Sequence, residues 1–206
     1  MHLLAAQPGG ISDGVQAVDL DQSPGDVVVL SAADSDLASL VAARDLLYKR
    51  GEGPPSLRLA NLMNLSHNLS VDLYVGSVIE KAKLVIVRLL GGRGYWSYGV
   101  EELASASRRK GVALALLPGD DQPDAELAAL STLSPEEIHR LWQYCVQGGV
   151  ENAVNFLRFA ASLIGQASSW QEPMPLLRAG LYWPGYDQPT LDDLRAAWVP
   201  EQPVVA

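Results

Sequence analysis

Cysteine and histidine are scarce in this chain of 206 residues. Cys145 is the only cysteine, and there are three histidines. A single thiol excludes a disulfide framework within the chain and a cysteine-rich zinc site. No His-Glu-x-x-His pattern brings two histidines to metal-binding spacing. Cys145 falls on the apolar face of an expected helix, so we interpret it as a core residue and predict no metal ligands.

Basic residues are also in short supply. Lysine and arginine total 15 against 24 aspartates and glutamates, which gives a formal net charge of −9. A sequence-independent nucleic-acid surface needs a clustered basic face. The only tight basic group, Arg108-Arg109-Lys110, lies at an expected helix end, where cations favour the helix dipole. We therefore expect no nucleic-acid partner.

Long apolar runs are absent. No stretch approaches the roughly 20 apolar residues that span a bilayer. The start, Met1-His2-Leu3-Leu4, has no basic segment followed by a long apolar one, so it does not resemble a signal peptide. The apolar fraction of 48% and the charged fraction of 19% are ordinary for a folded soluble protein. We expect a cytoplasmic protein with no membrane partner.

What the chain does have is an alternation of strand-like and helical segments. The runs that we interpret as buried strands are residues 27–30, 57–62, 84–87 and 112–117. Between them lie segments of helical periodicity, among them one over 70–82 that Ser70 would cap and one from about Ser97 to Gly111. This order predicts an α/β fold with a doubly wound, mostly parallel, flavodoxin-like sheet. Residues 11–26 lack helical periodicity, so the place of the short apolar run 3–6 stays open.

The chain changes character after residue 130. Ser134-Pro135-Glu136-Glu137 combines a capping serine, a proline at the first helical position and a glutamate at the third. A second helix is expected from about 150 to 164. We predict an α/β domain over 1–130 and a helical hairpin packed on it over 131–166. Residues 167–206 would form a linker and the start of a further, truncated domain, with a new strand beginning within 176–185.

A glycine-rich turn lies where the third of these strands meets the next helix. Its residues are Leu89-Leu90-Gly91-Gly92-Arg93-Gly94-Tyr95-Trp96. Ligands collect at the carboxyl edge of open α/β sheets, which is where this turn falls. Ser97 stands where a dinucleotide motif has its third glycine, and no Gly-Lys-Ser/Thr ending is present, so the turn is a poor phosphate cradle.

The same turn could bind other ligands. Its amides and Arg93 could hold a carboxylate, although Glu101 and Glu102 compete for the same helix dipole, and Tyr95 and Trp96 could stack on a flat ring. The alternative is a tight turn whose aromatic side chains only cover the sheet edge. The candidate substrate-binding residues are Gly91, Gly92, Arg93, Gly94, Tyr95 and Trp96.

Two further groups are candidates for chemistry. His67 lies in a polar loop with no partner in sequence, so we interpret it as solvent-facing rather than as an acid or base. The cluster Asp120, Asp121 and Asp124 could bind a hard cation, but a solvated loop is the favoured interpretation. No catalytic residue is predicted.

Four segments carry a family resemblance. They are residues 28–34, 89–96, 116–121 and 179–185, and the Gly-Gly-Arg-Gly-Tyr-Trp stretch is the most specific. The chain resembles the amino-terminal region of the CobN family, the large subunits of aerobic cobaltochelatase, which are related to the large subunit of magnesium chelatase. Those subunits are much longer, so the resemblance implies that this chain is a first portion.

The resemblance implies ATP-dependent insertion of cobalt into hydrogenobyrinic acid a,c-diamide, a step of cobalamin biosynthesis. The whole complex would use cobalt(II) and ATP-magnesium, with neither expected in this fragment. The implied partners are the corrinoid precursor and an AAA-type ATPase subunit with its own partner subunit. The fragment would contribute tetrapyrrole binding or subunit contact rather than chemistry. Alternatives are the large subunit of a magnesium chelatase, or a structural or small-ligand-binding α/β domain with no catalytic part.

Overall fold

The computed structural model describes residues 4–5, 16–175, 179–183, 185–186 and 189–198. The chain divides into two compact units, Met1–Met174 and Pro175–Ala206. The sheet lies in the first unit. The predicted segment 167–206, a linker and the start of a further domain, begins within the first unit, because residues 167–174 belong to that unit.

The first unit is built on one parallel sheet with the strand order β1-β3-β2-β4-β5. The strands are β1 (Leu4–Ala5), β2 (Val27–Ser31), β3 (Leu57–Asn61), β4 (Leu84–Leu89) and β5 (Ala113–Pro118). The predicted α/β class and the four predicted strands are therefore confirmed. The run whose place stayed open contributes β1, where Leu4 pairs with Leu59 at the edge of the sheet.

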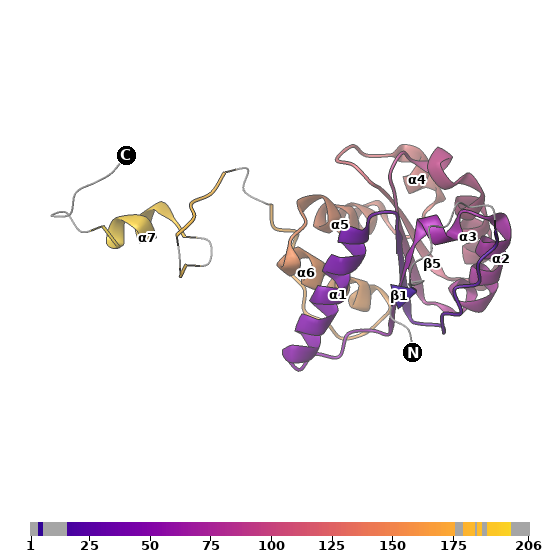
Figure 1. Ribbon diagram of the computed structural model, residues 1–206, viewed down its shortest axis with the longest axis horizontal. Helices are drawn as coiled ribbons and strands as arrows, with labels where there is room; N and C mark the ends of the chain where they lie inside the picture. The colour runs from indigo at the N-terminus through magenta and orange to yellow at the C-terminus, as the bar shows by residue number, and fades with distance from the viewer. Residues whose placement is uncertain (1–3, 6–15, 176–178, 184, 187–188, 199–206) are drawn as a thin grey trace. The chain divides into compact units, whose positions relative to one another are not determined.

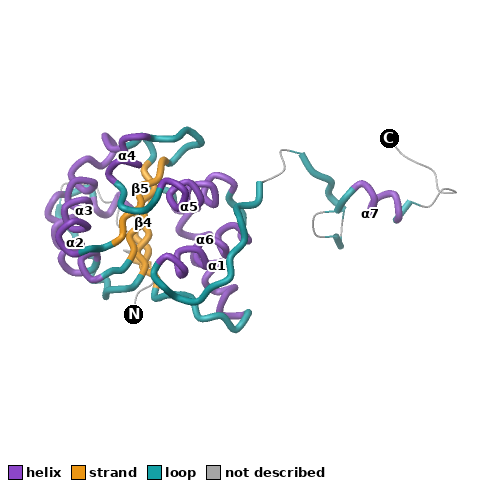
Figure 2. The backbone as a smooth tube through the Cα atoms, turned by 180° about the vertical axis from the view of Figure 1, so that it is seen from behind, coloured by secondary structure: helices purple, strands orange, loops and turns teal. Residues whose placement is uncertain are grey.

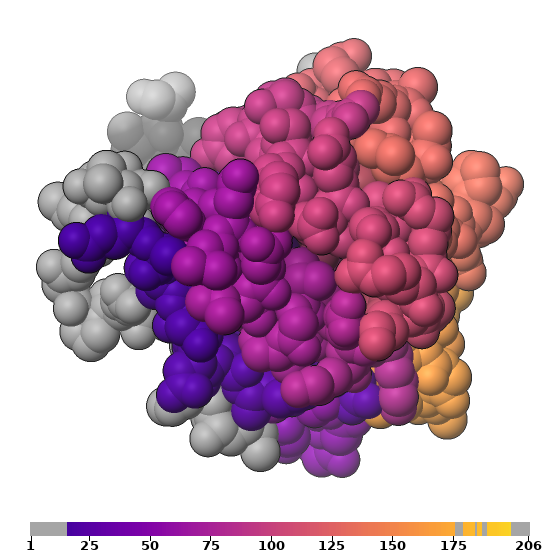
Figure 3. All heavy atoms as spheres, turned by 90° about the vertical axis from the view of Figure 1, so that its right-hand side faces the viewer, coloured from indigo at the N-terminus to yellow at the C-terminus, as the bar shows by residue number. Residues whose placement is uncertain are grey.

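Helices cover both faces of the sheet (Figures 1 and 2). On one face lie α1 (Asp34–Lys49), α5 (Pro135–Gln147) and α6 (Val150–Leu163). On the other lie α2 (Asn68–Ser77), α3 (Ser97–Lys110) and α4 (Ala125–Leu130). Short 3-10 turns are η1 (Leu62–Leu65), η2 (Ile79–Lys81) and η3 (Arg93–Trp96). In Figure 3, which looks onto the second face, residues of α2 and α3 cover the strands.

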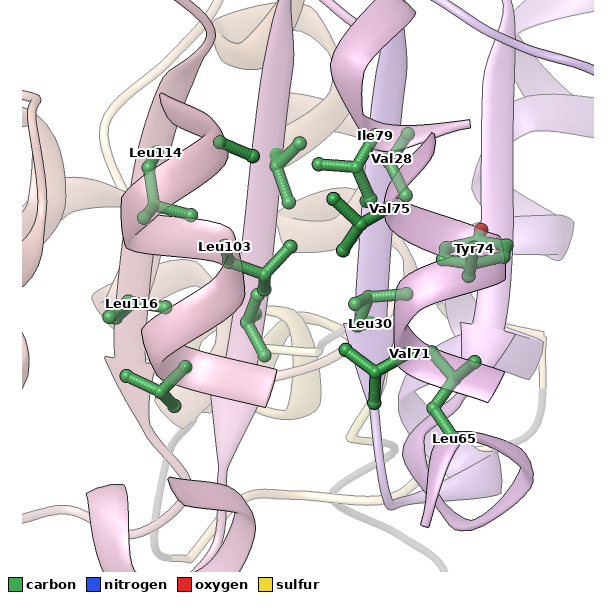
Figure 4. Packing of buried hydrophobic residues seen from close by; sticks show 14 of the residues in the cluster. Val28, Leu30, Leu65, Val71, Tyr74, Val75, Ile79, Leu103, Leu114 and Leu116 are labelled. Atoms are coloured by element: carbon green, nitrogen blue, oxygen red, sulfur yellow. The ribbon is translucent and has the colours of Figure 1, made fainter. Parts of the chain in front are cut away.

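Strand residues point alternately into two apolar layers. Val28 pairs with Val85 and faces the layer that includes α2 and α3, while Val29 pairs with Ile86 and faces α1, α5 and α6. Figure 4 shows the first layer, with Val75 and Leu103 directed at the sheet. Burial on both faces explains why these strands are uniformly apolar in sequence.

The helical hairpin is part of the second layer. The predicted capping box at its start is confirmed, because Glu137 N donates to Ser134 Oγ at 3.3 Å and Ser134 N donates to Glu137 Oε2 at 2.8 Å. Helix α6 packs along α1, and Tyr144 and Phe156 share one buried cluster with Val29. The sheet therefore needs the hairpin to cover this face.

Residues 170–174 are fastened across the hairpin by two buried asparagines. Asn152 Nδ2 donates to Met174 O at 2.8 Å and Asn152 Oδ1 accepts from Met174 N at 2.9 Å, while Asn155 Oδ1 accepts from Gln171 N at 3.1 Å. The Trp170 ring meets Phe159 edge to face, with their centroids 4.8 Å apart. These contacts explain why the first unit extends to Met174.

One buried cation holds the segment before β2. Arg58, on β3, is only 4% exposed, and its guanidinium donates to Leu57 O at 2.8 Å and to Pro24 O at 2.6 Å. Gly25 lies so close that an added Cβ would be 2.8 Å from Arg58 Cγ. The described part of the segment, residues 16–26, contains no helix and is held by side-chain hydrogen bonds instead.

The predicted start of α2 is wrong. The helix begins at Asn68, and His67 is its N-cap, with Nδ1 accepting from Leu69 N at 3.1 Å. Ser70 lies inside the helix, where its hydroxyl accepts from Val18 N at 2.7 Å. The end of α3 agrees with its sequence. The helix ends at Lys110, and Gly111 caps it with a left-handed φ of 72°.

The second unit contains α7 (Leu191–Ala196), which has its own capping box between Thr190 and Asp193. The described residues 179–183 and 185–186 form no strand, so the strand expected within 176–185 is not found there, while 176–178 and 184 lie outside the described residues. Across the described parts of both units, no helix is both long and apolar enough to cross a membrane.

Candidate functional site

The carboxyl ends of β2 and β4 flank the point where the sheet reverses its winding. The chain passes from β2 outward to β3, then returns across β2 to β4. Doubly wound proteins bind ligands at this topological switch point. A cavity of about 300 Å³ opens there, with Ala33, Arg88, Leu90, Tyr95 and Gly119 among its lining residues. We call it the edge cavity.

An ion pair between Arg88 and Asp36 forms part of the wall of the edge cavity. Arg88 donates to Asp36 Oδ1 at 2.7 Å and to Gly119 O at 2.8 Å. The second oxygen of Asp36 accepts from Ser31 Oγ at 2.7 Å. One network thus joins β2, α1, β4 and the loop after β5. Sequence reasoning missed it, although a single arginine at the end of an apolar run was a signal.

This network makes the switch point unsuited to phosphate. Asp36 neutralises the charge of Arg88 at the start of α1. Asp34 and Asp36 also lie in the first turn of α1. An anion at that helix end would meet two carboxylates beside the favourable dipole. The sequence indicated that the neighbouring glycine-rich turn is a poor phosphate cradle, and the β2–α1 loop is a poor one as well.

The first two glycines of the turn have a conformational role. Gly91 has a φ of 91° and Gly92 a φ of 69°, a region that side chains rarely adopt. An added Cβ on Gly92 would also lie 2.9 Å from an oxygen of Asp124. Gly94, by contrast, has open space around it. The backbone of Gly91 and Gly92 therefore turns the chain sharply out of β4 and into η3.

The arginine of the turn is held by two carboxylates. Arg93 donates to Glu126 Oε1 at 2.8 Å and to Glu101 Oε1 at 2.7 Å. The hydrogen bond with Glu126, followed by that with Glu101, raises the pKa of Arg93. The pairs link the turn to α3 and α4. The sequence had pointed to Glu101 as a competitor, but Glu126 comes from α4, a helix that was not predicted.

The structure separates the two aromatic residues of the turn. Trp96 is 9% exposed, and its Nε1 donates to Leu65 O at 2.8 Å inside the core. Tyr95 is 46% exposed at the edge cavity, and its hydroxyl lies 3.4 Å from Met63 Sδ. Only Tyr95 therefore presents a ring to the outside, while Trp96 fastens η3 to η1.

The aspartates after β5 shape their own loop. Asp124 is the N-cap of α4, with Oδ1 accepting from Glu126 N at 2.9 Å. Asp120 Oδ1 accepts from Gln122 N at 3.1 Å, and Asp121 Oδ1 accepts from the Gln122 side chain at 3.2 Å. Among the described residues, no group of three or more histidines, cysteines, aspartates or glutamates is arranged to hold a metal ion.

His67 and Cys145 both contribute to the fold. His67 caps α2 through Nδ1, as described above. Cys145 lies on α5 against the sheet, and burial raises the pKa of its thiol to about 12. A thiol of that pKa stays protonated near neutral pH, so it is a poor nucleophile.

Comparison with known proteins places the chain in a family. No protein-family model matches it. It is 45% identical over 207 residues to the aerobic cobaltochelatase subunit CobN of Pseudomonas aeruginosa, which covers 100% of the chain and 16% of that relative. The corresponding subunit of a Sinorhizobium species is 47% identical over 185 residues, covering 90% of the chain and 14% of the relative. The chain belongs to the CobN family.

The fold supports the same relationship. The catalytic subunit of cobaltochelatase from Mycobacterium tuberculosis matches with a TM-score of 0.59 and 26% identity, over 77% of this chain and 12% of that one. The match to the two CobN relatives falls in their amino-terminal region. The chain spans only 14–16% of the length of these relatives.

In this CobN-family chain, the sheet edge presents an apolar surface with acidic surroundings. Met63, Leu90 and Tyr95 are between 46% and 59% exposed, and we call them the edge surface. At the same edge, Asp34 after β2 and Asp120 and Asp121 after β5 are exposed, and Asp124 is half-buried. Both arginines there, Arg88 and Arg93, are already paired with carboxylates.

Proposed function

We propose that this chain forms the amino-terminal part of the large subunit of an ATP-dependent cobaltochelatase. The complex would insert cobalt into hydrogenobyrinic acid a,c-diamide during cobalamin biosynthesis. The identity of 45–47% to relatives named as cobaltochelatase subunits supports cobalt over magnesium as the metal. ATP-magnesium would bind to an AAA-type ATPase subunit, which acts with its own partner subunit.

Within that complex, we assign the chain a role in contact rather than in chemistry. Metal insertion requires a base for the macrocycle N–H protons and ligands that pass the metal on. The observation that carries the assignment is the pairing of Arg93 with Glu101 and Glu126. In the glycine-rich turn, Arg93 is therefore paired within the chain, and Trp96 is buried beneath the turn.

Tetrapyrrole binding by residues 91–96 remains a second candidate because of Tyr95. This ring is exposed beside a cavity of about 300 Å³, where a flat macrocycle could stack on it. The acidic residues nearby oppose this role, since hydrogenobyrinic acid a,c-diamide still carries several carboxylates and like charges repel. The two roles predict different behaviour of the isolated chain.

A titration separates them. The purified chain is titrated with hydrogenobyrinic acid a,c-diamide while corrinoid absorbance and tryptophan fluorescence are recorded. The contact role predicts no saturable change. Saturable binding that Tyr95→Ala abolishes and Tyr48→Ala preserves would assign the turn to the tetrapyrrole instead. Tyr48 is a matched control because it is a similarly exposed tyrosine, on α1.

The activity itself is tested with the full-length subunit that contains this chain. That subunit is combined with the ATPase subunits, the corrinoid precursor and cobalt(II), and the product is followed by its absorbance. We expect cobalt insertion that depends on ATP. Insertion of magnesium into a porphyrin without any insertion of cobalt would contradict the proposal.

A further inference from the structure

The edge surface is a contiguous apolar group rather than a set of scattered residues. The Tyr95 hydroxyl touches Met63 Sδ at 3.4 Å, and Tyr95 and Leu90 line the edge cavity together with Ala32 and Ala33. Single exposed apolar side chains are normal on a protein surface, whereas contiguous ones mark interaction sites. The three residues come from η1, from the turn after β4 and from η3, and the β2–α1 loop adjoins them at the edge cavity.

The edge surface is also held rigidly from below. An added Cβ on Gly119 would lie 2.6 Å from Leu90 Cα, so the backbone of Leu90 rests directly on the loop after β5. Trp96, next to Tyr95, is bonded to Leu65 O, and Arg93 is fastened to α3 and α4. A surface fixed in this way loses little conformational entropy when it binds.

The charges around the edge surface indicate the chemistry of what covers it. Asp34, Asp120 and Asp121 are exposed at the same edge of the sheet and Asp124 is half-buried there, and the side-chain hydrogen bonds of all four are to neutral groups. Complementary potentials favour binding and like charges suppress wrong partners. The occupant should therefore have an apolar centre and cations at its rim, which a polycarboxylate macrocycle does not provide.

We infer that the edge surface docks against the downstream part of the same large subunit, through an apolar segment with lysine or arginine at its margins. This inference rests on the proposed function. The chain spans only 14–16% of its CobN relatives, so most of such a subunit is covalently joined to it. A joined segment has an effective concentration of the order of millimolar, an advantage that no separate subunit shares.

Thiol labelling of single variants tests this in the intact subunit. Tyr95→Cys and Leu90→Cys are made both in the 206-residue chain and in the full-length subunit, and iodoacetamide labelling is followed by mass spectrometry of the peptide concerned. Tyr48→Cys, at a site that is 55% exposed on α1, is the matched control. The native Cys145 is half-buried and the pKa of its thiol is raised to about 12, so it adds little background.

We expect labelling at positions 90 and 95 to be at least tenfold slower in the full-length subunit than in the chain, with position 48 changed less than twofold. A short cross-linker attached at position 95 should then join to a downstream basic peptide of the same subunit. Equal labelling in both proteins would overturn the inference. Protection that appears only after the ATPase subunits or the corrinoid precursor are added would also overturn it, in favour of those occupants.

Cobalt insertion is also measured with the full-length subunit variants before they are labelled. This measurement separates the docking inference from the proposed function. If cobalt is inserted but position 95 is labelled equally in the chain and in the full-length subunit, the docking inference is wrong and the proposed function stands. Protection at position 95 without any cobalt insertion would support the docking and contradict the function.

Discussion

Replacing Gly99 with alanine should strongly destabilise the packing of Trp96 beneath the glycine-rich turn. Gly99 lies in the first turn of α3, directly against the Trp96 indole. An ideal Cβ built on Gly99 would lie 2.0 Å from Trp96 Cε2 and 2.2 Å from Cζ2. No real Cβ contact is that short, so the indole must move. Trp96 is nearly fully buried and bonded to Leu65 O, so it has little room to do so.

Three effects set the size of the change in the free energy of unfolding. Overpacking a core costs about 1–3 kcal/mol. If the indole shifts far enough to lose its bond, the buried Leu65 carbonyl is left unpaired, which costs about 1–3 kcal/mol more. Alanine recovers roughly 0.5–1 kcal/mol through its better helix propensity. With central values for each, Gly99→Ala should destabilise the first unit by about 3 kcal/mol.

Gly76→Ala is the matched control. Gly76 lies near the end of α2, and a Cβ there would meet nothing within 4 Å. The same substitution should therefore stabilise the protein slightly, by about 0.5 kcal/mol. Urea unfolding followed by far-ultraviolet circular dichroism compares the two variants. With a slope of about 2 kcal/mol per molar, the midpoint for Gly99→Ala should fall by roughly 1.5 M. A Gly99→Ala variant as stable as the parent would refute the packing described for Trp96.

Two further predictions concern buried and paired charges. Hydrogen bonds from Arg158 and Arg50 lower the pKa values of Glu52 and Glu151, so both pairs contribute stability above the ordinary glutamate pKa of 4.5 and lose it as pH falls below that value. Urea midpoints measured between pH 6 and pH 3 should fall less steeply for Arg158→Gln than for the parent, and equal slopes would contradict this. Arg58→Leu removes the hydrogen bonds to the buried Leu57 carbonyl and to the part-buried Pro24 carbonyl, so it should cost about 2 kcal/mol in the same assay at pH 7. A loss below about 0.5 kcal/mol would show that the hydrogen bonds of Arg58 are dispensable for stability.

The strands and most helix positions, including the capped start of α5, follow from local sequence, whereas the start of α2 does not. A parallel strand buried on both faces must be uniformly apolar, so residues 84–87 could be assigned without knowing any neighbour. The start of α2 was misplaced because His67 and Ser70 both offer a capping side chain. What decides between them is the bond from Val18 N to the Ser70 hydroxyl, across 52 residues of sequence. No local pattern contains that contact.

The candidate site shows the same division between local and distant information. The turn at the end of β4 was found from its glycines and its place after a strand. The role of its arginine was not, because Glu126 lies 33 residues further on, in a helix of six residues whose pattern is too short to stand out. Arg88 and Asp36 are likewise 52 residues apart. The partners of both arginines therefore come from distant parts of the sequence, which local patterns do not reveal.

These pairings bear on how a fold with a ligand-binding edge can serve a different purpose. The switch point between β2 and β4 is the expected ligand crevice of a doubly wound sheet. Here Asp36 neutralises Arg88, and Glu101 with Glu126 neutralises Arg93, so neither cation at that edge is left to attract an anion. What the edge still offers is an apolar centre with carboxylates around it. A polycarboxylate macrocycle needs the opposite charge, so the charges of this edge fit the proposed docking better than they fit tetrapyrrole binding.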